Sequence, residues 1–183
     1  MLRKEEIRQQ IKRRKRQFTE EQLRELSLAI IDRLLGHPRI KKAKRILMYY
    51  SLPDEVYTHE AIIQLVNEGK EVFLPVVLDN FEMELHKFSR KDNMSEGAFN
   101  IMEPIGHKYT DFDSIDVAVI PAIAYDEKNN RLGRGKGYYD RFLAKIPLAY
   151  KIGICFDFQK ITDIPADNND AVSYTHLTLP TIA

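Results

Sequence analysis

The alternation of apolar and polar residues along the chain predicts a succession of helices and strands. Residues 5–18 carry Ile7 and Ile11 one helical turn apart among many charged residues, a spacing typical of a helix with one buried face. A second helix is predicted to begin at the capping-box sequence Thr19–Gln22 and to end at Gly36. Its buried face consists of apolar residues at helical spacing: Leu23, Leu26, Ile30, Leu34 and Leu35.

Short apolar runs in the rest of the chain predict strands. The runs are residues 45–50, 71–77, 82–88, 117–120 and 151–156. Asp79 and Asn80 are turn residues between the second and third runs, so these two strands are expected to be antiparallel neighbours. Helical spacing marks two segments that lie between strands: Ala61, Ile62 and Leu65 before Gly69, and later Tyr138, Tyr139, Phe142, Leu143 and Ile146.

Strands that alternate with helices predict an α/β fold with three layers, α/β/α, and a mostly parallel, Rossmann-like sheet. We expect a single domain over residues 1–170, because 183 residues is the size of one domain and neither a linker nor a repeat interrupts the chain. In such sheets, ligands bind beyond the carboxyl ends of the strands. The predicted strand 117–120 leads towards a glycine-rich segment, and the strand 45–50 leads into Ser51–Glu55.

Charge and composition exclude several classes of protein without selecting one. The 28 Lys and Arg residues nearly balance the 27 Asp and Glu residues, so no overall field favours nucleic acid or a membrane surface. The single cysteine, Cys155, allows no internal disulfide and is expected to be a core strand residue. The first residues are too charged for a signal peptide, and no apolar run approaches the ~18 residues of a membrane span. We expect a soluble, cytoplasmic, monomeric protein with no membrane or nucleic-acid partner.

Residues Asn130–Asp140, here called the glycine-rich segment, alternate glycines with cations. Glycine lets the backbone turn and approach a ligand closely, so that its N–H groups can point at phosphate oxygens. The Arg and Lys side chains between the glycines supply positive charge to the same oxygens. A helix that begins here would add the positive end of its dipole. The segment is interpreted as a polyphosphate cradle; the alternative is a flexible basic turn between a strand and a helix.

Two common nucleotide-binding motifs do not describe the glycine-rich segment. A Walker A sequence needs Ser or Thr after Gly-Lys, whereas Gly137 follows Lys136. The dinucleotide-binding pattern needs a third glycine where Tyr139 and Asp140 stand.

The sequence NRLGRGKGYYD, preceded by Val119–Asp126, closely resembles the signature of the 5-formyltetrahydrofolate cyclo-ligase family, also called methenyltetrahydrofolate synthetases. Lys4–Arg8 is similar to the Lys-x-x-x-Arg of that family. Ser51–Glu55, with Thr58 shortly after it, is similar to the Ser-x-x-x-Glu-x-x-Thr of the family. The resemblance extends from about Lys4 to Asp170.

The resemblance implies an ATP-dependent ring closure of 5-formyltetrahydrofolate to 5,10-methenyltetrahydrofolate, with release of ADP and phosphate. It assigns ATP contacts to two parts of the chain: Lys4, Glu5, Glu6, Ile7 and Arg8, and then Arg131, Leu132, Gly133, Arg134, Gly135, Lys136, Gly137, Tyr138 and Tyr139. Phosphoryl transfer needs positioning and charge neutralisation, so Arg134 is the first candidate for a catalytic residue. This chemistry needs no protein nucleophile, and the sequence shows no pattern typical of a Ser-His-Asp or Cys-His catalytic site.

The resemblance also implies a folate site and a metal. Its folate contacts are Tyr50, Glu55, Arg134, Gly135, Lys136, Gly137 and Tyr138, and its Mg²⁺ ligands are Asp140 and Asp170. Taken alone, Glu55 could be a solvated turn carboxylate, and Tyr138 and Tyr139 could be ordinary aromatic residues at a helix start. His59, His86 and His107 lack metal-ligand spacing and are assigned no role.

The basic start of the chain supports a rival interpretation. Residues 1–16 hold eight Lys or Arg against two Glu, a net charge of +6 (8 − 2), and such a cluster could bind nucleic acid. Lys12–Arg16 lacks interleaved aromatic residues, so we interpret it as a solvated helix face. Lys4 and Arg8 lie one helical turn apart and are taken as ATP contacts.

Two other functions stay open as alternatives. The alternatives are a folate or nucleotide binder that has lost turnover, and an RNA-associated basic module.

The end of the chain departs from the family pattern. Asn168 and Asn169 stand before Asp170 where the family carries a Glu-x-Asp or His-Asp element. Residues 171–183 contain no Lys, Arg, Asp or Glu, and we interpret them as an atypical tail, either non-native or lineage-specific.

Overall fold

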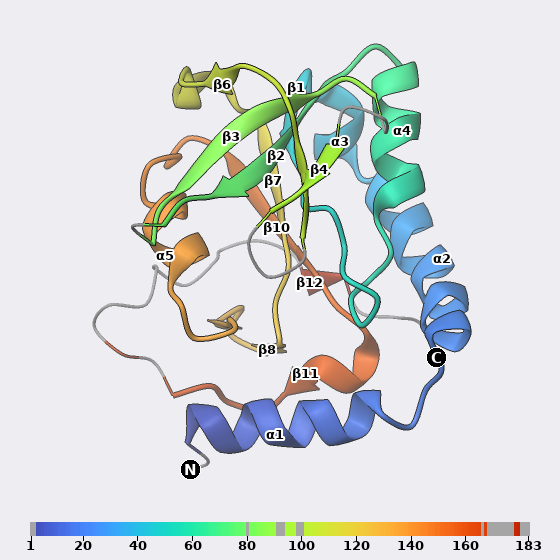
Figure 1. Cartoon of the computed structure of the whole chain (residues 1–183). Coiled ribbons are helices and arrows are strands. Elements are labelled where there is room, and N and C mark those ends of the chain that lie inside the picture. The colour runs from blue at the N-terminus through green and yellow to red at the C-terminus, as the bar shows by residue number, and fades with distance from the viewer. Residues whose placement is uncertain are drawn as a thin grey trace.

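The computed structural model describes residues 3–79, 81–90, 94–97, 101–165, 167 and 178–179. Within these residues, a seven-stranded sheet has the order β12-β10-β7-β1-β2-β3-β6 (Figure 1). Its strands are β1 (Arg45–Leu47), β2 (Glu71–Val77), β3 (Met83–Phe88), β6 (Lys108–Tyr109), β7 (Val117–Ile120), β10 (Tyr150–Ile154) and β12 (Thr178–Leu179).

The five strands from β12 to β2 are parallel, whereas β3 and β6 are antiparallel to their neighbours. β3 follows β2 after a short turn, and a connection of that length cannot carry the chain back to start a parallel strand. The predictions of a mostly parallel sheet and of an antiparallel 82–88 strand are therefore confirmed.

Helices cover both faces of this sheet (Figure 1). Ile46, Val72 and Val117 belong to a core cluster with α2 (Glu20–Gly36), α3 (Pro38–Lys42) and α4 (His59–Asn67). The next residues along the same strands, Leu47 and Phe73 among them, belong to a second cluster with α5 (Tyr138–Leu143). Successive side chains of a strand point to opposite faces, so strands buried on both faces read as continuous apolar runs. The α/β class is confirmed.

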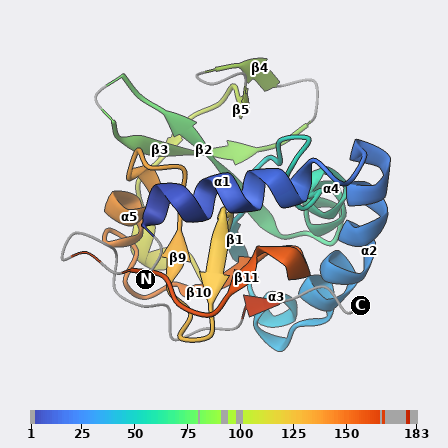
Figure 2. The same ribbon diagram turned by 90° about the horizontal axis from the view of Figure 1, so that it is seen from below.

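Helix α1 (Lys4–Lys15) crosses the lower edge of the molecule in Figure 1, outside these layers, and it lies in front when the molecule is seen from below (Figure 2). Its buried residues Ile7 and Ile11 pack with Ala124 and Leu132 in a third core cluster. The helix thus lies against a small three-stranded sheet of β11 (Lys160–Ile161), β8 (Ala124–Asp126) and β9 (Arg131–Leu132). The apolar pattern did not reveal this sheet, because strands of two or three residues carry no measurable period.

Several element bounds differ from the predicted ones. α5 ends at Leu143, and the chain continues to Ile146 in tighter turns, in which the Lys145 and Ile146 N–H groups donate to the carbonyls of Phe142 and Leu143. Pro147 disfavours a helical conformation at Ile146. Arg131 and Leu132 form strand β9 instead of belonging to a loop. Further short elements are β4 (Met94–Glu96) and β5 (Met102–Pro104), which pair with each other, and the 3-10 helices η3 (Phe112–Ser114) and η4 (Asp157–Gln159).

The core position predicted for Cys155 is confirmed, and the interpretation of residues 171–183 as an atypical tail stays a prediction. Cys155 is fully buried, and burial raises the pKa of its thiol to about 12, as expected of a core residue. In the atypical tail the described residues Thr178 and Leu179 pair in parallel with Gly153 and Ile154, and the rest of that tail lies outside the described residues. Among the helices of the described part, none is both long and apolar enough to cross a membrane.

Candidate functional site

A cavity of about 960 Å³ lies at the carboxyl ends of the central strands. Its walls come from the residues after β1, from the ends of β2 and β7, from the start of α1 and from the glycine-rich segment. This is where α/β sheets bind ligands. The predicted site residues that line the cavity are Lys4, Arg8, Tyr50, Glu55, Arg131, Leu132, Gly133, Arg134, Gly135, Lys136, Gly137, Tyr138, Tyr139 and Asp140.

Two glycines of the glycine-rich segment adopt left-handed backbone conformations. Gly135 has φ +99° and Gly137 has φ +71°, values that a residue with a Cβ atom rarely adopts. The Arg8 Nε atom donates a hydrogen bond of 3.0 Å to the carbonyl of Gly133, and this contact ties α1 to the segment. Gly137 is the N-cap of α5, which has only six residues and therefore a weaker dipole than the predicted longer helix would have.

Arg131 is held by three protein contacts. Its side chain is only 7% exposed; Nε donates to the carbonyl of Pro121 at 2.7 Å, and Nη1 lies 3.5 Å from an oxygen of Asp140. Its guanidinium also lies over the Tyr139 ring, 5.0 Å from the centroid. Arg131 therefore links β9, the end of β7 and the start of α5 in addition to facing the cavity.

Arg134, in contrast, is half exposed and faces acidic residues. Its Nη2 atom lies 3.4 Å from Asp54 Oδ1 and 3.9 Å from Glu55 Oε2. Burial raises the pKa of Glu55, and the positive charge of Arg134 opposes that rise. A guanidinium and a carboxylate predicted from separate motifs thus meet at the same cavity.

Glu55 belongs to a loop, residues 51–58, that is held by its own hydroxyl groups. The Ser51 backbone N–H donates to Thr58 Oγ1 at 3.1 Å, and the Thr58 N–H donates to Ser51 Oγ at 3.0 Å. The Thr58 hydroxyl donates in turn to the carbonyl of Tyr49 at 2.6 Å. Glu55 Oε1 accepts a hydrogen bond from the Leu52 N–H at 2.9 Å, so one carboxylate oxygen is fixed by the loop itself.

The spacing Ser51-x-x-x-Glu55-x-x-Thr58 therefore has a structural reason. Ser51 and Thr58 close the loop, and Glu55 is presented from it. Tyr50, on the cavity wall before this loop, stacks on His59 with ring centroids 3.6 Å apart, and burial raises its pKa. His59 also contacts the carbonyl of Ser51 at 2.8 Å, so the histidine that received no role supports Tyr50 and the loop.

Three predicted ATP-binding residues do not line this cavity. Glu5 and Glu6 are exposed on α1, where Glu6 Oε2 accepts from the Arg3 N–H and Glu5 pairs with Arg8. Ile7 is buried in the core cluster beneath α1.

The metal prediction concerns one residue that the structure describes and one that it does not. Asp140 lines the cavity and pairs with Arg131, whereas Asp170 lies outside the described residues. Within the described ranges, no group of three or more His, Cys, Asp or Glu could hold a metal ion. The donor set does not form a protein cage, but it fits Mg²⁺ held mainly by phosphate oxygens and water with one or two carboxylates.

Sequence reasoning missed most of the apolar wall of the cavity. That wall includes Tyr49, Leu52, Pro75, Val77, Met83, Ile101, Pro121, Ala122 and Ile123. Pro75 and Val77 stand at the carboxyl end of a predicted strand, which was the available signal for them. Two charged residues were also missed: Arg141, and Asp167, which pairs with Lys4 at 2.7 Å.

Comparison with known proteins shows which proteins resemble this chain over nearly its whole length. The model of the 5-formyltetrahydrofolate cyclo-ligase family matches residues 1–178. The 5-formyltetrahydrofolate cyclo-ligase of Escherichia coli K12 is 31% identical over 168 residues, which cover 87% of this chain and 91% of that protein.

Solved structures agree with the sequence match. A 5,10-methenyltetrahydrofolate synthetase from Aquifex aeolicus has a TM-score of 0.83 and 30% identity, and the match covers 97% of this chain and 89% of that one. A synthetase of the same name from Mycoplasma pneumoniae has a TM-score of 0.76 and 25% identity, with coverage of 97% and 98%.

Proposed function

This chain belongs to the 5-formyltetrahydrofolate cyclo-ligase family, and on that premise we propose that it uses ATP to close 5-formyltetrahydrofolate to 5,10-methenyltetrahydrofolate. One observation carries the proposal. The glycine-rich segment, with Arg134 at its centre, shares a cavity with Glu55 and Tyr50. A cationic, glycine-rich surface suits a polyphosphate, and an acidic and aromatic surface suits a pterin ring, which offers N–H donors and a flat face.

The reaction follows from the weak reactivity of the formyl group. The formyl carbon on nitrogen 5 belongs to an amide, so resonance makes it a poor electrophile. Its oxygen attacks the γ-phosphorus of ATP; an O–P bond forms, the bond to ADP breaks, and ADP leaves. Nitrogen 10 then attacks the same carbon and loses its proton, and the C–O bond breaks to release phosphate. The product carries the carbon between both nitrogens.

Each half of the cavity has a role in this sequence. Lys4, Arg8 and Lys136 would neutralise the triphosphate, and the N–H groups around Gly135 would cradle its oxygens. Arg134 would hold the phosphoryl group during transfer, where charge accumulates. Glu55 would accept hydrogen bonds from the pterin, while the apolar wall excludes water from the activated formyl group.

Mg²⁺ would neutralise phosphate charge, with Asp140 and Asp170 as the proposed carboxylate ligands. The ATP contacts proposed for Arg131, Leu132, Gly133, Gly137, Tyr138 and Tyr139 follow from the family resemblance, and Glu5, Glu6 and Ile7 are not among them because they do not line the cavity. We also propose a monomer without nucleic-acid partners, located in the cytoplasm; a relative from Arabidopsis thaliana is named as mitochondrial.

Turnover by the purified protein tests the proposal. With 5-formyltetrahydrofolate, ATP and Mg²⁺, the absorbance of methenyltetrahydrofolate should rise, and ADP should appear in equal amount. Leaving out either ATP or Mg²⁺ should abolish the rise. Equal product formation without nucleotide would exclude the phosphoryl-activation mechanism, and binding of both substrates without product would favour the binder that has lost turnover.

A further inference from the structure

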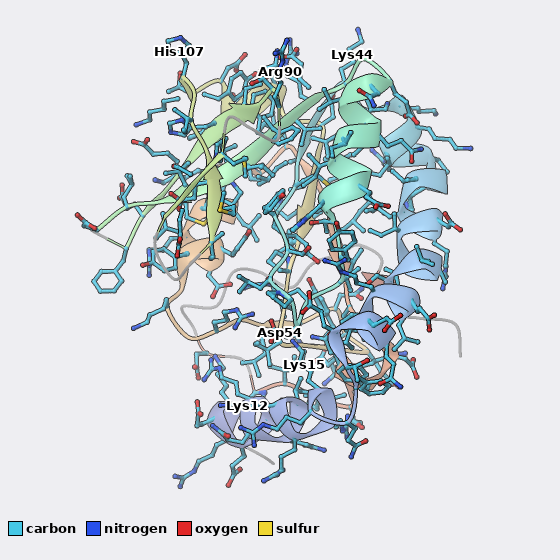
Figure 3. The ribbon with its side chains drawn as sticks, turned by 45° about the vertical axis from the view of Figure 1, so that its right-hand side comes forward. Lys12, Lys15, Lys44, Asp54, Arg90 and His107 are labelled. Atoms are coloured by element: carbon cyan, nitrogen blue, oxygen red, sulfur yellow. The ribbon has the colours of Figure 1, made fainter. Side chains whose placement is uncertain are left out.

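Asp54 connects the end of α1 to the glycine-rich segment. Its Oδ2 atom lies 3.2 Å from Lys15 Nζ, and its Oδ1 atom lies 3.4 Å from Arg134 Nη2. Each oxygen of one carboxylate thus faces a different cation. Figure 3 shows Asp54 and Lys15 beside each other, above α1.

The two cations differ in their freedom to move. Lys15 is 8% exposed and lies in the last turn of α1, so its ammonium depends on a nearby counter-charge. Arg134 is 51% exposed on a glycine-rich backbone. Burial raises the pKa of Asp54, but the charges of Lys15 and Arg134 outweigh burial and lower it, so Asp54 stays ionised at neutral pH. Lys15 therefore fixes Asp54, and Asp54 in turn restrains Arg134.

Glu55 completes the arrangement from the neighbouring position. Its Oε2 lies 3.9 Å from the same Arg134 nitrogen, while its Oε1 is held by the Leu52 N–H. The guanidinium is therefore near two carboxylates of the loop 51–58, at the wall of the cavity.

We propose that Asp54, anchored by Lys15, is a positioning residue that holds the Arg134 guanidinium beside Glu55, ready for the transferring phosphoryl group. This inference rests on the proposed function. An ion pair with both members about half exposed contributes little to folding, so stability alone does not account for its place at the cavity. Orientation has a larger effect on rate, since a misplacement of 1 Å can cost about 100-fold.

Kinetics of Asp54→Asn test the role of the carboxylate. The variant keeps the shape of the side chain but loses its charge, so kcat should fall about tenfold while KM for ATP and for the folate changes less than about twofold. Asp54→Glu should recover part of the loss. Asp163→Asn is the matched control, because it removes a Lys–Asp pair of similar length, Lys128–Asp163 at 3.1 Å, away from the cavity; its kcat should equal that of the wild type.

A double-mutant cycle separates positioning from a structural role. If Asp54 acts through Arg134, Asp54→Asn with Arg134→Lys should be no slower than Arg134→Lys alone, within about twofold. If Asp54→Asn does not fold because Lys15 is left unpaired, Lys15→Met with Asp54→Asn removes both charges and enters the cycle in its place. Lys15→Met alone should lower kcat less than Asp54→Asn.

Unchanged kcat in folded Asp54→Asn, or losses that multiply with those of Arg134→Lys, would overturn the positioning role while leaving the proposed function intact. A wild-type protein without turnover would overturn both.

Discussion

The loop 51–58 and the glycine-rich segment meet at the Arg134–Glu55 contact, yet they are held in different ways. The loop is closed by bonds between its own residues, chiefly Ser51 and Thr58, which are both buried. The glycine-rich segment is held mainly by arginine side chains: Arg8 of α1 donates to the carbonyl of Gly133, Arg141 donates to the carbonyl of Lys136, and Arg131 pairs with Asp140 inside the segment. The loop is therefore closed by short bonds between buried groups, whereas the segment depends on long arginine side chains, one of which comes from α1.

The largest effect on activity should follow from a change of Arg134, on the glycine-rich side of the Arg134–Glu55 contact. Arg134→Lys keeps the charge but loses the planar fork that holds two oxygens at once. Because that contact is strongest in the transition state, kcat should fall by about 10³–10⁵ while ATP still binds. Steady-state kinetics with a separate ATP-binding measurement check this.

Lys136→Ala is the comparison for that variant. A flexible ammonium neutralises ground-state charge, so its loss should raise KM for ATP more than it lowers kcat. If Arg134→Lys instead changed only KM for ATP, Arg134 would be a passive clamp, and catalysis would have to be assigned to Mg²⁺ and the backbone.

A change in the loop 51–58 should mainly lower the stability of the fold. Thr58→Val preserves shape but leaves the Ser51 N–H and the Tyr49 carbonyl without the hydroxyl that bonds them. Leaving buried groups unpaired should lower the free energy of unfolding by about 1–3 kcal/mol, as denaturant unfolding would measure. KM for the folate should rise with it, because Glu55 is carried by the same loop. An unchanged midpoint would mean that the loop is not closed by these bonds.

Changes of Lys4 and Arg8, the cations of α1 at the cavity, should affect the KM for ATP alone. Lys4→Ala with Arg8→Ala removes two cavity cations and the bond to the Gly133 carbonyl, so KM for ATP should rise about tenfold with the folate KM nearly unchanged. Lys12→Ala with Arg13→Ala is the control, since both residues are exposed on the same helix. If the Lys12/Arg13 control lost activity while the Lys4/Arg8 variant kept it, the assignment of Lys4 and Arg8 as the ATP contacts of α1 would be contradicted.

The smallest expected effect is a pH dependence of stability. Burial raises the pKa of Glu55, so folding favours its protonated form. This preference contributes to the free energy of unfolding at pH values below the ordinary glutamate pKa. The contribution is lost as the pH rises through the raised pKa of Glu55 in the folded protein. Glu55→Gln should therefore gain stability relative to the wild type across that range. A stability difference that stays constant from pH 4 to 8 would contradict the shift.

The sequence predicted the large elements of the fold because their apolar periods are long. The helix with Leu23 and Ile30 was found in this way, whereas the strand Val117–Ile120 was found as a continuous apolar run. Strand β9 was missed, since two residues have no period, and Arg131 was therefore expected in a loop. The predicted segments of the cavity came from three short motifs and from the family that these motifs resemble.

Contacts between distant segments could not be predicted in the same way. Lys15 was interpreted as part of a solvated face, yet it is buried against Asp54, 39 residues away along the chain. Likewise, buried Asp126 accepts from the N–H groups of Lys128, Asn130 and Ile164 and thereby fixes the turn before the glycine-rich segment. Such pairs depend on how the elements pack, and a single sequence carries no record of that packing.

The path of the formyl oxygen tests the central claim most directly. If 5-formyltetrahydrofolate carries ¹⁸O in its formyl group, phosphorylation of that oxygen followed by C–O cleavage must transfer the label to inorganic phosphate. The account predicts one ¹⁸O atom in each phosphate released during turnover, measured by mass spectrometry. Phosphate without the label, with ¹⁸O found in water instead, would show that the oxygen leaves without being phosphorylated and would contradict the account.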